Sequence, residues 1–215
     1  MVPAAPPPRR LTRRLIQLYA GLVTFAFGEA LILEAGLGVI PWDVFQQGLV
    51  NHWGLTMGTW SIIVGVAVLL LWIPLRQRPG IGTVSNAIVI GAALDPMLRA
   101  IEAPESLGWR AAYLVAGILI NGVATAAYIG ARLGPGPRDG LMTGLVRLTG
   151  RSVRLVRTGL EVTVVLIGWA LGGNLGLGTV LFAVSIGPVV HVFLPKLTVP
   201  GDRHCTEGHI SAQAW

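Results

Sequence analysis

Long apolar runs alternate with short polar or glycine-rich segments along most of the chain. A run of about 20 apolar residues is long enough for a helix to cross the hydrocarbon core of a bilayer. Six runs approach this length, and they cover residues 15–33, 59–73, 82–98, 109–130, 153–171 and 178–194. The pattern therefore predicts six membrane-spanning helices.

Two segments between these runs are too short, and too interrupted by glycine and proline, to cross a membrane. They cover residues 36–50 and 132–150. In each, a proline followed two residues later by an aspartate is typical of the start of a helix. We therefore predict two short broken helices, which begin near Pro41 and Pro137.

The two broken segments are copies of each other. A shift of 96 positions takes seven residues of the first segment onto identical residues of the second, without a gap. The same shift takes Gly-Ile-Gly-Thr-Val at 80–84 onto Gly-Leu-Gly-Thr-Val at 176–180. A repeat at one fixed offset indicates that the chain is built from two homologous halves.

The repeat predicts how the chain is organised. We expect a basic N-terminal segment (1–14), a first membrane repeat (15–98), an outer linker (99–108), a second repeat (109–195) and a tail (196–215). Each repeat holds three predicted crossings, an odd number, so the second repeat must enter the membrane upside down relative to the first. The predicted fold is an all-α polytopic membrane protein with a 3+3 inverted repeat.

Composition agrees with a membrane protein. Hydrophobic residues make up 53% of the chain, charged residues 12%, and the mean hydropathy is +0.69. This leaves no room for a sizeable soluble catalytic domain, and we expect neither an enzyme activity nor a cofactor. His204, Cys205 and His209 in the tail are weak evidence for a metal site, so no metal is predicted.

The basic residues indicate topology rather than a nucleic-acid partner. The net charge is +6 at pH 7, but Lys and Arg are dispersed between the apolar runs instead of gathered on one face. With the N-terminus in the cytoplasm, fourteen of the 16 basic residues face the cytoplasm and only Arg99 and Arg110 face outward. This bias predicts that both termini are cytoplasmic.

Asp43 and Asp139 occupy the same position in the two broken segments. Each can cap its helix by accepting backbone N–H hydrogen bonds. Alternatively, the pair contacts a cation, a proton or a solute amine, because broken backbone at membrane depth needs protein or a watery cavity around it. A cap at the edge of a cavity can serve both roles. Trp42 and Arg138, the residues in front of them, belong to the same candidate site.

Acidic residues inside the apolar runs extend the candidate site. Glu29 lies deep in the first run and has no oppositely charged neighbour in its own helix. Such a residue is costly in hydrocarbon and by default faces protein or water. Glu161 follows Arg157 by one helical turn, and we expect these two to form a helix-face pair near the cytoplasmic surface.

Asn86, Asn121 and His191 complete the polar set within the runs. Amides in such positions usually form hydrogen bonds between helices. His191 is equivalent to Asp95 under the shift, so it can either pack between helices or take part in a proton relay.

The Gly-Leu-Gly-x-x-Pro-Trp-Asp stretch at 36–43 and the paired Gly-x-Gly-Thr stretches at 80–83 and 176–179 resemble the bacterial YczE/YyaS/YitT group of integral membrane proteins. The resemblance covers roughly residues 15–195. It implies a bacterial plasma-membrane protein with several spans, and it supplies no settled activity and no binding residues. No soluble domain of the YitT type is expected after the last run, so the chain looks closer to the YczE branch.

Inverted repeats built around interrupted helices are shared by many secondary transporters, in which the interrupted backbone lines a site between the repeats. We therefore expect a small transporter or permease-like protein with its solute site bordered by Asp43, Asp139 and Glu29. The expected partners are the lipid bilayer and a small solute of unknown identity. Six short spans enclose little volume, so a homodimer is also considered.

The alternative function is that of a non-transporting accessory protein, which scaffolds or regulates a cytoplasmic enzyme. Its contact surface would be the basic face around Arg138, Arg147 and Arg151.

Overall fold

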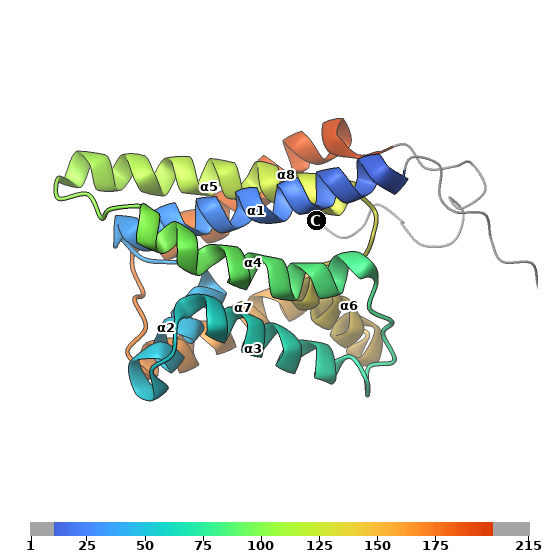
Figure 1. Ribbon diagram of the computed structural model, residues 1–215. Coiled ribbons are helices and arrows are strands. Elements are labelled where there is room, and N and C mark those ends of the chain that lie inside the picture. Colours follow the sequence, from blue (N-terminus) through green and yellow to red (C-terminus); the bar gives the residue numbers. More distant parts are fainter. Residues whose placement is uncertain (1–10, 200–215) are drawn as a thin grey trace, which may run out of the picture.

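The protein is all-helical over residues 11–199, the part of the chain that the computed structural model describes. Eight α-helices and no strand occur there (Figure 1). They are α1 (Leu11–Ala35), α2 (Pro41–Trp53), α3 (Met57–Leu71), α4 (Ile81–Ala100), α5 (Leu107–Gly130), α6 (Pro137–Thr149), α7 (Val153–Ala170) and α8 (Leu177–Leu197). The predicted all-α class is confirmed, and each apolar run and each broken segment corresponds to one helix.

The ends of the described region differ from the predicted boundaries. α1 already begins at Leu11, inside the predicted N-terminal segment, and α8 continues to Leu197, inside the predicted tail. Residues 1–10 and 200–215 lie outside the described part, and so do most of those two segments.

Four helices, α1, α4, α5 and α8, are long and apolar enough to cross a membrane on their own. α2 and α3 together qualify as one broken span, bent by 114°. α7 carries Arg154, Arg157 and Glu161 within its 18 residues. Length and composition thus support four or five spans, and the number of six stays a prediction.

The helix starts follow from the residues in front of them. Side chains at three N-cap positions each accept a hydrogen bond from the backbone N–H three residues later; they are Thr56, Ser106 and Ser152. In the repeated Gly-x-Gly-Thr stretches, the hydroxyl groups of Thr83 and Thr179 accept a hydrogen bond from the glycine N–H that precedes the helix. α2 and α6 each begin with a proline, which has no N–H to leave unpaired.

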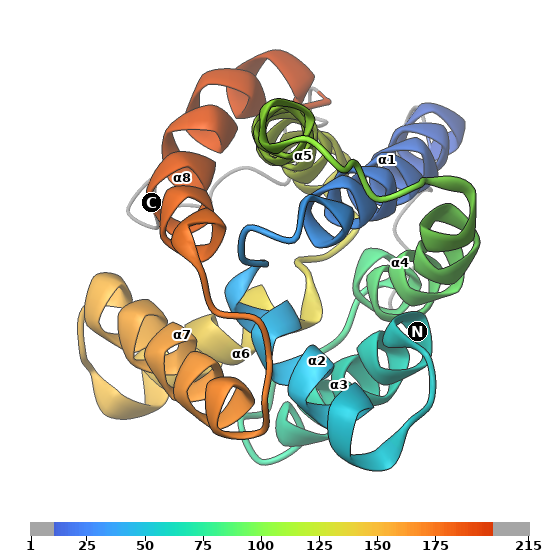
Figure 2. The same cartoon turned by 90° about the vertical axis from the view of Figure 1, so that its left-hand side faces the viewer.

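The helices form two layers (Figure 1). In one layer α1 packs along α5, with α4 beside α1 and α8 beside α5. In the other, α2 packs on α7 and α3 contacts α6, and α4 joins the layers through α3. In the end-on view the remaining helices surround the first turns of α2 and α6 (Figure 2).

Small residues bring α1 and α5 close together. A Cβ added at Gly28 would lie 3.0 Å from the carbonyl oxygen of Gly117, and a Cβ added at Gly117 would lie 2.8 Å from that of Gly28. Close approach through glycine is a common way for helices to associate in membranes.

Contacts between the two halves are reciprocal. The N–H of Gly178 donates to the carbonyl oxygen of Leu37 at 2.8 Å, and the N–H of Gly82 donates to that of Leu133 at 2.8 Å. The 96-residue shift relates Gly82 to Gly178 and Leu37 to Leu133. Each half therefore places the loop before its short helix against the start of the last helix of the other half.

Glycine makes these loop contacts sterically allowed. Gly38 and Gly134 are equivalent residues, and their φ angles are +111° and +129°, which side chains rarely permit. A Cβ at Gly38 would lie 2.7 Å from Cα of Gly176, and a Cβ at Gly134 would lie 3.2 Å from Cα of Gly80.

One pair of equivalent helix contacts differs between the halves. α3 packs along α4, and a Cβ added at Gly91 would lie only 2.5 Å from the carbonyl oxygen of Gly58. The equivalent residues of α7 and α8 are Arg154 and Gly187. Nothing lies within 4 Å of a Cβ added at Gly187, and α7 stands apart from α8 (Figure 2).

Asp95 holds the α3–α4 interface together. Its Oδ1 accepts a hydrogen bond from the N–H of Gly58 at 2.8 Å, and its Oδ2 accepts one from the hydroxyl of Thr56. The carboxylate thus binds the first turn of α3, where a negative charge also faces the positive end of the helix dipole. His191, the equivalent residue of α8, is exposed and makes no such contact within residues 11–199.

Candidate functional site

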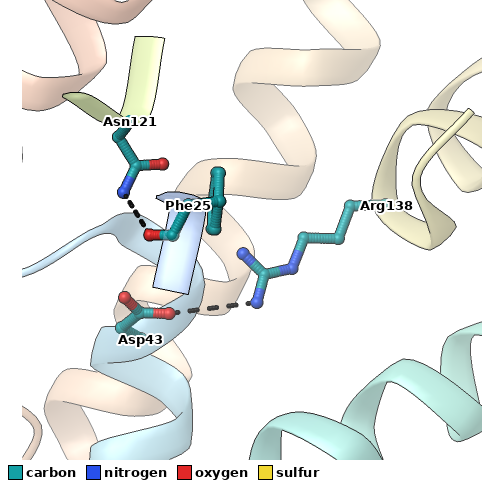
Figure 3. Close-up of polar contacts among 4 residues, drawn as sticks. All are labelled: Phe25, Asp43, Asn121 and Arg138. Carbon is teal, nitrogen blue, oxygen red and sulfur yellow. Dashed lines mark hydrogen bonds and ion pairs between the residues drawn. The ribbon is translucent and has the colours of Figure 1, made fainter. Parts of the chain in front are cut away.

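The first turns of α2 and α6 meet in the middle of the protein. Trp42 and Arg138 are equivalent residues, and Cζ of Arg138 lies 5.0 Å from the centroid of the Trp42 ring. A cation over an indole face is attracted by the electrons of the ring. Nη2 of Arg138 also lies 3.9 Å from Oδ1 of Asp43 (Figure 3). The two copies of the broken segment are therefore in direct contact.

A partly enclosed cavity of about 160 Å³ lies beside this contact. Every one of the eight helices contributes to its wall. The volume is comparable with that of an engineered protein cavity of about 150 Å³ that binds benzene. The cavity therefore has room for a small organic molecule.

The cavity wall combines apolar surface with charged groups. Arg138 and Asp139 come from α6, whereas Arg157 and Glu161 come from α7, where Nε of Arg157 donates to Oε1 of Glu161 at 3.0 Å. The other hydrogen-bonding side chains of the wall are Ser61, Trp42, Asn86, Thr125 and Tyr128. Two arginines balance two carboxylates, so the wall suits a neutral or zwitterionic molecule better than a strongly charged ion.

Three polar side chains lie buried behind this wall. Glu29 of α1 is 1% exposed, and Asp43 and Gln46 of α2 are 0% exposed. None of their side-chain oxygen or nitrogen atoms has a hydrogen-bond partner among the described residues. Glu29 and Asp43 are neighbours, and Gln46 follows Asp43 by one turn on the same face of α2. Buried polar groups without partners are rare, because they lose their hydration without compensation.

Asn121 links α5 to α1 close to this cluster. Its Nδ2 donates to the carbonyl oxygen of Phe25 at 3.3 Å (Figure 3). Phe25 and Asn121 are also equivalent residues of the repeat, so a second pair of equivalent positions is in contact. The bond is of the interhelical kind that amides form in membrane helices.

The structure divides the predicted site residues into three groups. Those that line the cavity are Trp42, Asn86, Arg138 and Asp139. Those that are buried behind its wall are Glu29, Asp43 and Asn121. His191 lies on an exposed face of α8 and is not part of the cavity wall, so the structure does not bring it to the other seven.

The two aspartates do not hold the N-cap positions of their helices. Ile40 and Gly136 hold the N-cap positions, and neither helix has a side-chain cap hydrogen bond. Asp43 and Asp139 are the third residues of their helices, where a carboxylate faces the positive end of the helix dipole.

Sequence reasoning missed part of the site. The residues that it did not assign there are Gln46, Tyr128, Arg157 and Glu161. The Arg157–Glu161 pair forms as predicted, but it lines the cavity instead of lying only at the membrane surface. One signal could have found Gln46, because it lies one helical turn from Asp43. The structure shows in addition that Ser61 and Gly65, the α3 equivalents of Arg157 and Glu161, also line the cavity.

No group of three or more His, Cys, Asp or Glu side chains capable of holding a metal ion occurs within residues 11–199. His204, Cys205 and His209 lie outside that part of the chain.

Comparison with known sequences assigns the chain to a family. A family model with the description "Family of unknown function (DUF6198)" matches residues 12–195, which is most of the chain. The chain belongs to this family. The motif-based resemblance is therefore confirmed, and the protein is a member of a membrane-protein family of unknown function.

Relatives of this DUF6198 protein cover most of its length. An "Uncharacterized protein" of Haemophilus influenzae is 44% identical over 179 residues, 83% of this chain and 82% of the relative. The "Uncharacterized membrane protein YczE" of Bacillus subtilis is 35% identical over 190 residues, 87% of this chain and 88% of the relative. The "Uncharacterized protein YyaS" of the same organism is 27% identical over 188 residues, 86% and 92% of the two chains. No solved structure matches.

Proposed function

We propose that this protein is a small transporter of the bacterial plasma membrane and that its solute site is the central cavity. The observation that carries the proposal is the position of the cavity, between two interrupted helices and within walls supplied by all eight helices. Charged side chains are costly inside a membrane protein and typically mark substrate or ion pathways. Arg138, Asp139, Arg157 and Glu161 are such side chains.

An inverted repeat is part of the proposal. The reciprocal hydrogen bonds of Gly82 and Gly178 support a two-fold relation between the halves. In transporters with this architecture the ends of interrupted helices border the site, as the first turns of α2 and α6 do here. We infer that the halves are inserted in opposite orientations and that both termini are cytoplasmic.

Thiol labelling tests this orientation. His52 and Leu148 are equivalent and exposed at the ends of α2 and α6, so His52→Cys and Leu148→Cys are compared in a Cys205→Ser background. A membrane-impermeant reagent should label His52→Cys in intact cells and Leu148→Cys only after lysis. Labelling of both from the same side would contradict the inverted arrangement.

The wall of the cavity indicates the class of solute. A zwitterion of amino-acid size could place its carboxylate near the arginines, its amine near Asp139 or Glu161 and its apolar part against the Trp42 ring. Charge-assisted hydrogen bonds of this kind are stronger than neutral ones.

Counterflow in liposomes tests transport. Liposomes with the purified protein are loaded with unlabelled zwitterionic amino acids, and entry of the labelled compounds is compared with entry of phosphate and of choline. Amino-acid entry should exceed that of both ions. Arg157→Gln and Asp139→Asn should each lower it about tenfold, the effect of losing one charge-assisted hydrogen bond of about 1.4 kcal/mol.

Arg147→Gln is the matched control, because Arg147 is exposed on α6 and lies outside the cavity wall. Its counterflow should equal that of the unchanged protein. Absence of counterflow for every probe would refute the proposal.

The accessory-protein alternative is less well supported. It needs Arg138 on an external basic face, but the Arg138 side chain, 31% exposed, contacts Trp42 and Asp43 and lines the cavity. Arg147 and Arg151 are exposed, as that alternative requires. Transport accounts for the inward position of Arg138, so we retain transport as the proposed function.

A further inference from the structure

The cluster of Glu29, Asp43 and Gln46 is separate from the cavity that we assign to the solute. None of the three lines the cavity wall, and all of their side-chain polar atoms are hidden from solvent. Their equivalents in the other half, Thr125, Asp139 and Met142, all line the cavity. The three positions are thus buried in the first half, whereas the equivalent positions of the second half face the cavity.

The charges of the cluster do not balance. The charged groups that act on the Glu29 carboxyl are Asp43 of α2 and, more weakly, Arg138 of α6. α5, which also packs on α1, contributes the neutral amide of Asn121. Two buried carboxylates therefore face one guanidinium, 3.9 Å from Asp43. Adjacent buried carboxylates do not both ionise readily beside a single guanidinium, which the cavity wall also shares, so the cluster lacks at least one positive charge.

The space around the carboxylates indicates which cation supplies that charge. A metal ion such as Ca²⁺ needs about six to eight oxygen ligands at about 2.3–2.6 Å and room for itself. No water-sized space reaches the oxygen atoms of Glu29 or Asp43, and a bound proton needs none. A proton held between the two carboxyl groups would also give one of them the hydrogen-bond partner that both lack.

We propose that Glu29 and Asp43 form a proton-binding site and that its proton is the coupling ion of the transporter, an inference that rests on the proposed function. Arg138 connects the two sites, because it faces Asp43 on one side and lines the cavity on the other. Release of the proton leaves a second negative charge beside Arg138 and draws its guanidinium toward the carboxylates. Arg138 is then less available to a solute carboxylate in the cavity, which couples the two binding events.

Infrared spectroscopy of the full chain in lipid vesicles tests the site directly. A protonated carboxyl group in an apolar environment has a carbonyl stretching band that disappears on ionisation. The unchanged protein should show such a band, and its intensity should depend on pH. The band should be lost in Glu29→Gln and in Asp43→Asn. Glu34→Gln, a change on the same helix at a half-buried position, should retain it.

Counterflow and gradient-driven uptake of labelled amino acids in the same vesicles separate the two proposals. An imposed inward proton gradient should drive accumulation by the unchanged protein and by Glu34→Gln. Glu29→Gln should still exchange solute but should not accumulate it. A band that persists in both Glu29→Gln and Asp43→Asn, or accumulation by Glu29→Gln, would overturn the proton site. Absence of all amino-acid exchange in the unchanged protein would instead refute the transport function, while the infrared band still decides whether the pair binds a proton.

Discussion

The α3–α4 and α7–α8 helix pairs occupy equivalent places in the two halves, yet one is packed and the other is apart. The three residues that α3 places along this side are Gly58, Ser61 and Gly65, and their equivalents on α7 are Arg154, Arg157 and Glu161. Glycine lets two backbones approach, as at Gly58 and Gly91. Charged side chains need water or ionic partners, and they keep α7 away from α8.

The difference lies in the residues and not in the helices, since both pairs consist of two α-helices at equivalent places in the sequence. Two of these positions line the cavity in both halves: Ser61 and Gly65 of α3 contribute a hydroxyl group and bare backbone, whereas Arg157 and Glu161 of α7 contribute charged side chains. The same comparison explains why Asp95 and His191 differ in their contacts. Asp95 binds the first turn of α3, which packs against its helix, whereas α7 does not pack against the helix that carries His191. The cavity is therefore bordered by equivalent positions of both halves, and the differences between the halves determine which of these positions carry charge.

Replacing glycine by alanine in the two interfaces should have unequal effects. Gly91→Ala places a methyl group against the backbone of Gly58 and should lower the free energy of unfolding by about 2 kcal/mol, the usual cost of overpacking. Gly187→Ala meets open space and should change it by less than about 0.5 kcal/mol. Unfolding in detergent micelles measures both. Equal destabilisation would show that α7 and α8 also pack closely.

Removing Asp95 should have the next largest effect. Asp95→Ala leaves the Gly58 N–H and the Thr56 hydroxyl without their acceptor, and we expect a loss of about 1.5 kcal/mol, as for hydrogen bonds to a charged group. The control is His191→Ala, a change at the equivalent exposed position. In the same unfolding assay it should change the free energy of unfolding by less than about 0.5 kcal/mol. If the two variants lose the same stability, the α3–α4 interface does not depend on the carboxylate.

Much of the fold could be predicted because apolar runs, and the glycine and proline residues between them, can be recognised in short stretches of sequence. The predicted run at 82–98 became α4 (Ile81–Ala100), and the run at 109–130 became α5 (Leu107–Gly130). Helix ends were less accurate, since Leu11 and Leu197 extend helices into segments that looked polar. Capping depends on one or two residues, and a proline at the first position allowed Ile40 to hold the N-cap in place of an aspartate.

The site was only partly predictable, because burial is a property of the assembled helices. Asp43 and Asp139 look the same in the sequence, yet Asp43 is fully buried and Asp139 lines the cavity. Asn86 and His191 also look alike as single polar residues within apolar runs. Only the packing of α8 against α5 shows that His191 faces outward.

Two pairs of residues from corresponding positions, Trp42 with Arg138 and Phe25 with Asn121, touch each other. In a dimer of identical half-length chains with the two-fold relation that we propose, each of these residues would meet its own copy. An arginine at this position would face a second arginine, and the two positive charges would repel each other. A single mutation would change both copies at once, so it could not place an arginine above a tryptophan. Joining both halves in one polypeptide removes this constraint, because each partner of a pair can then evolve independently.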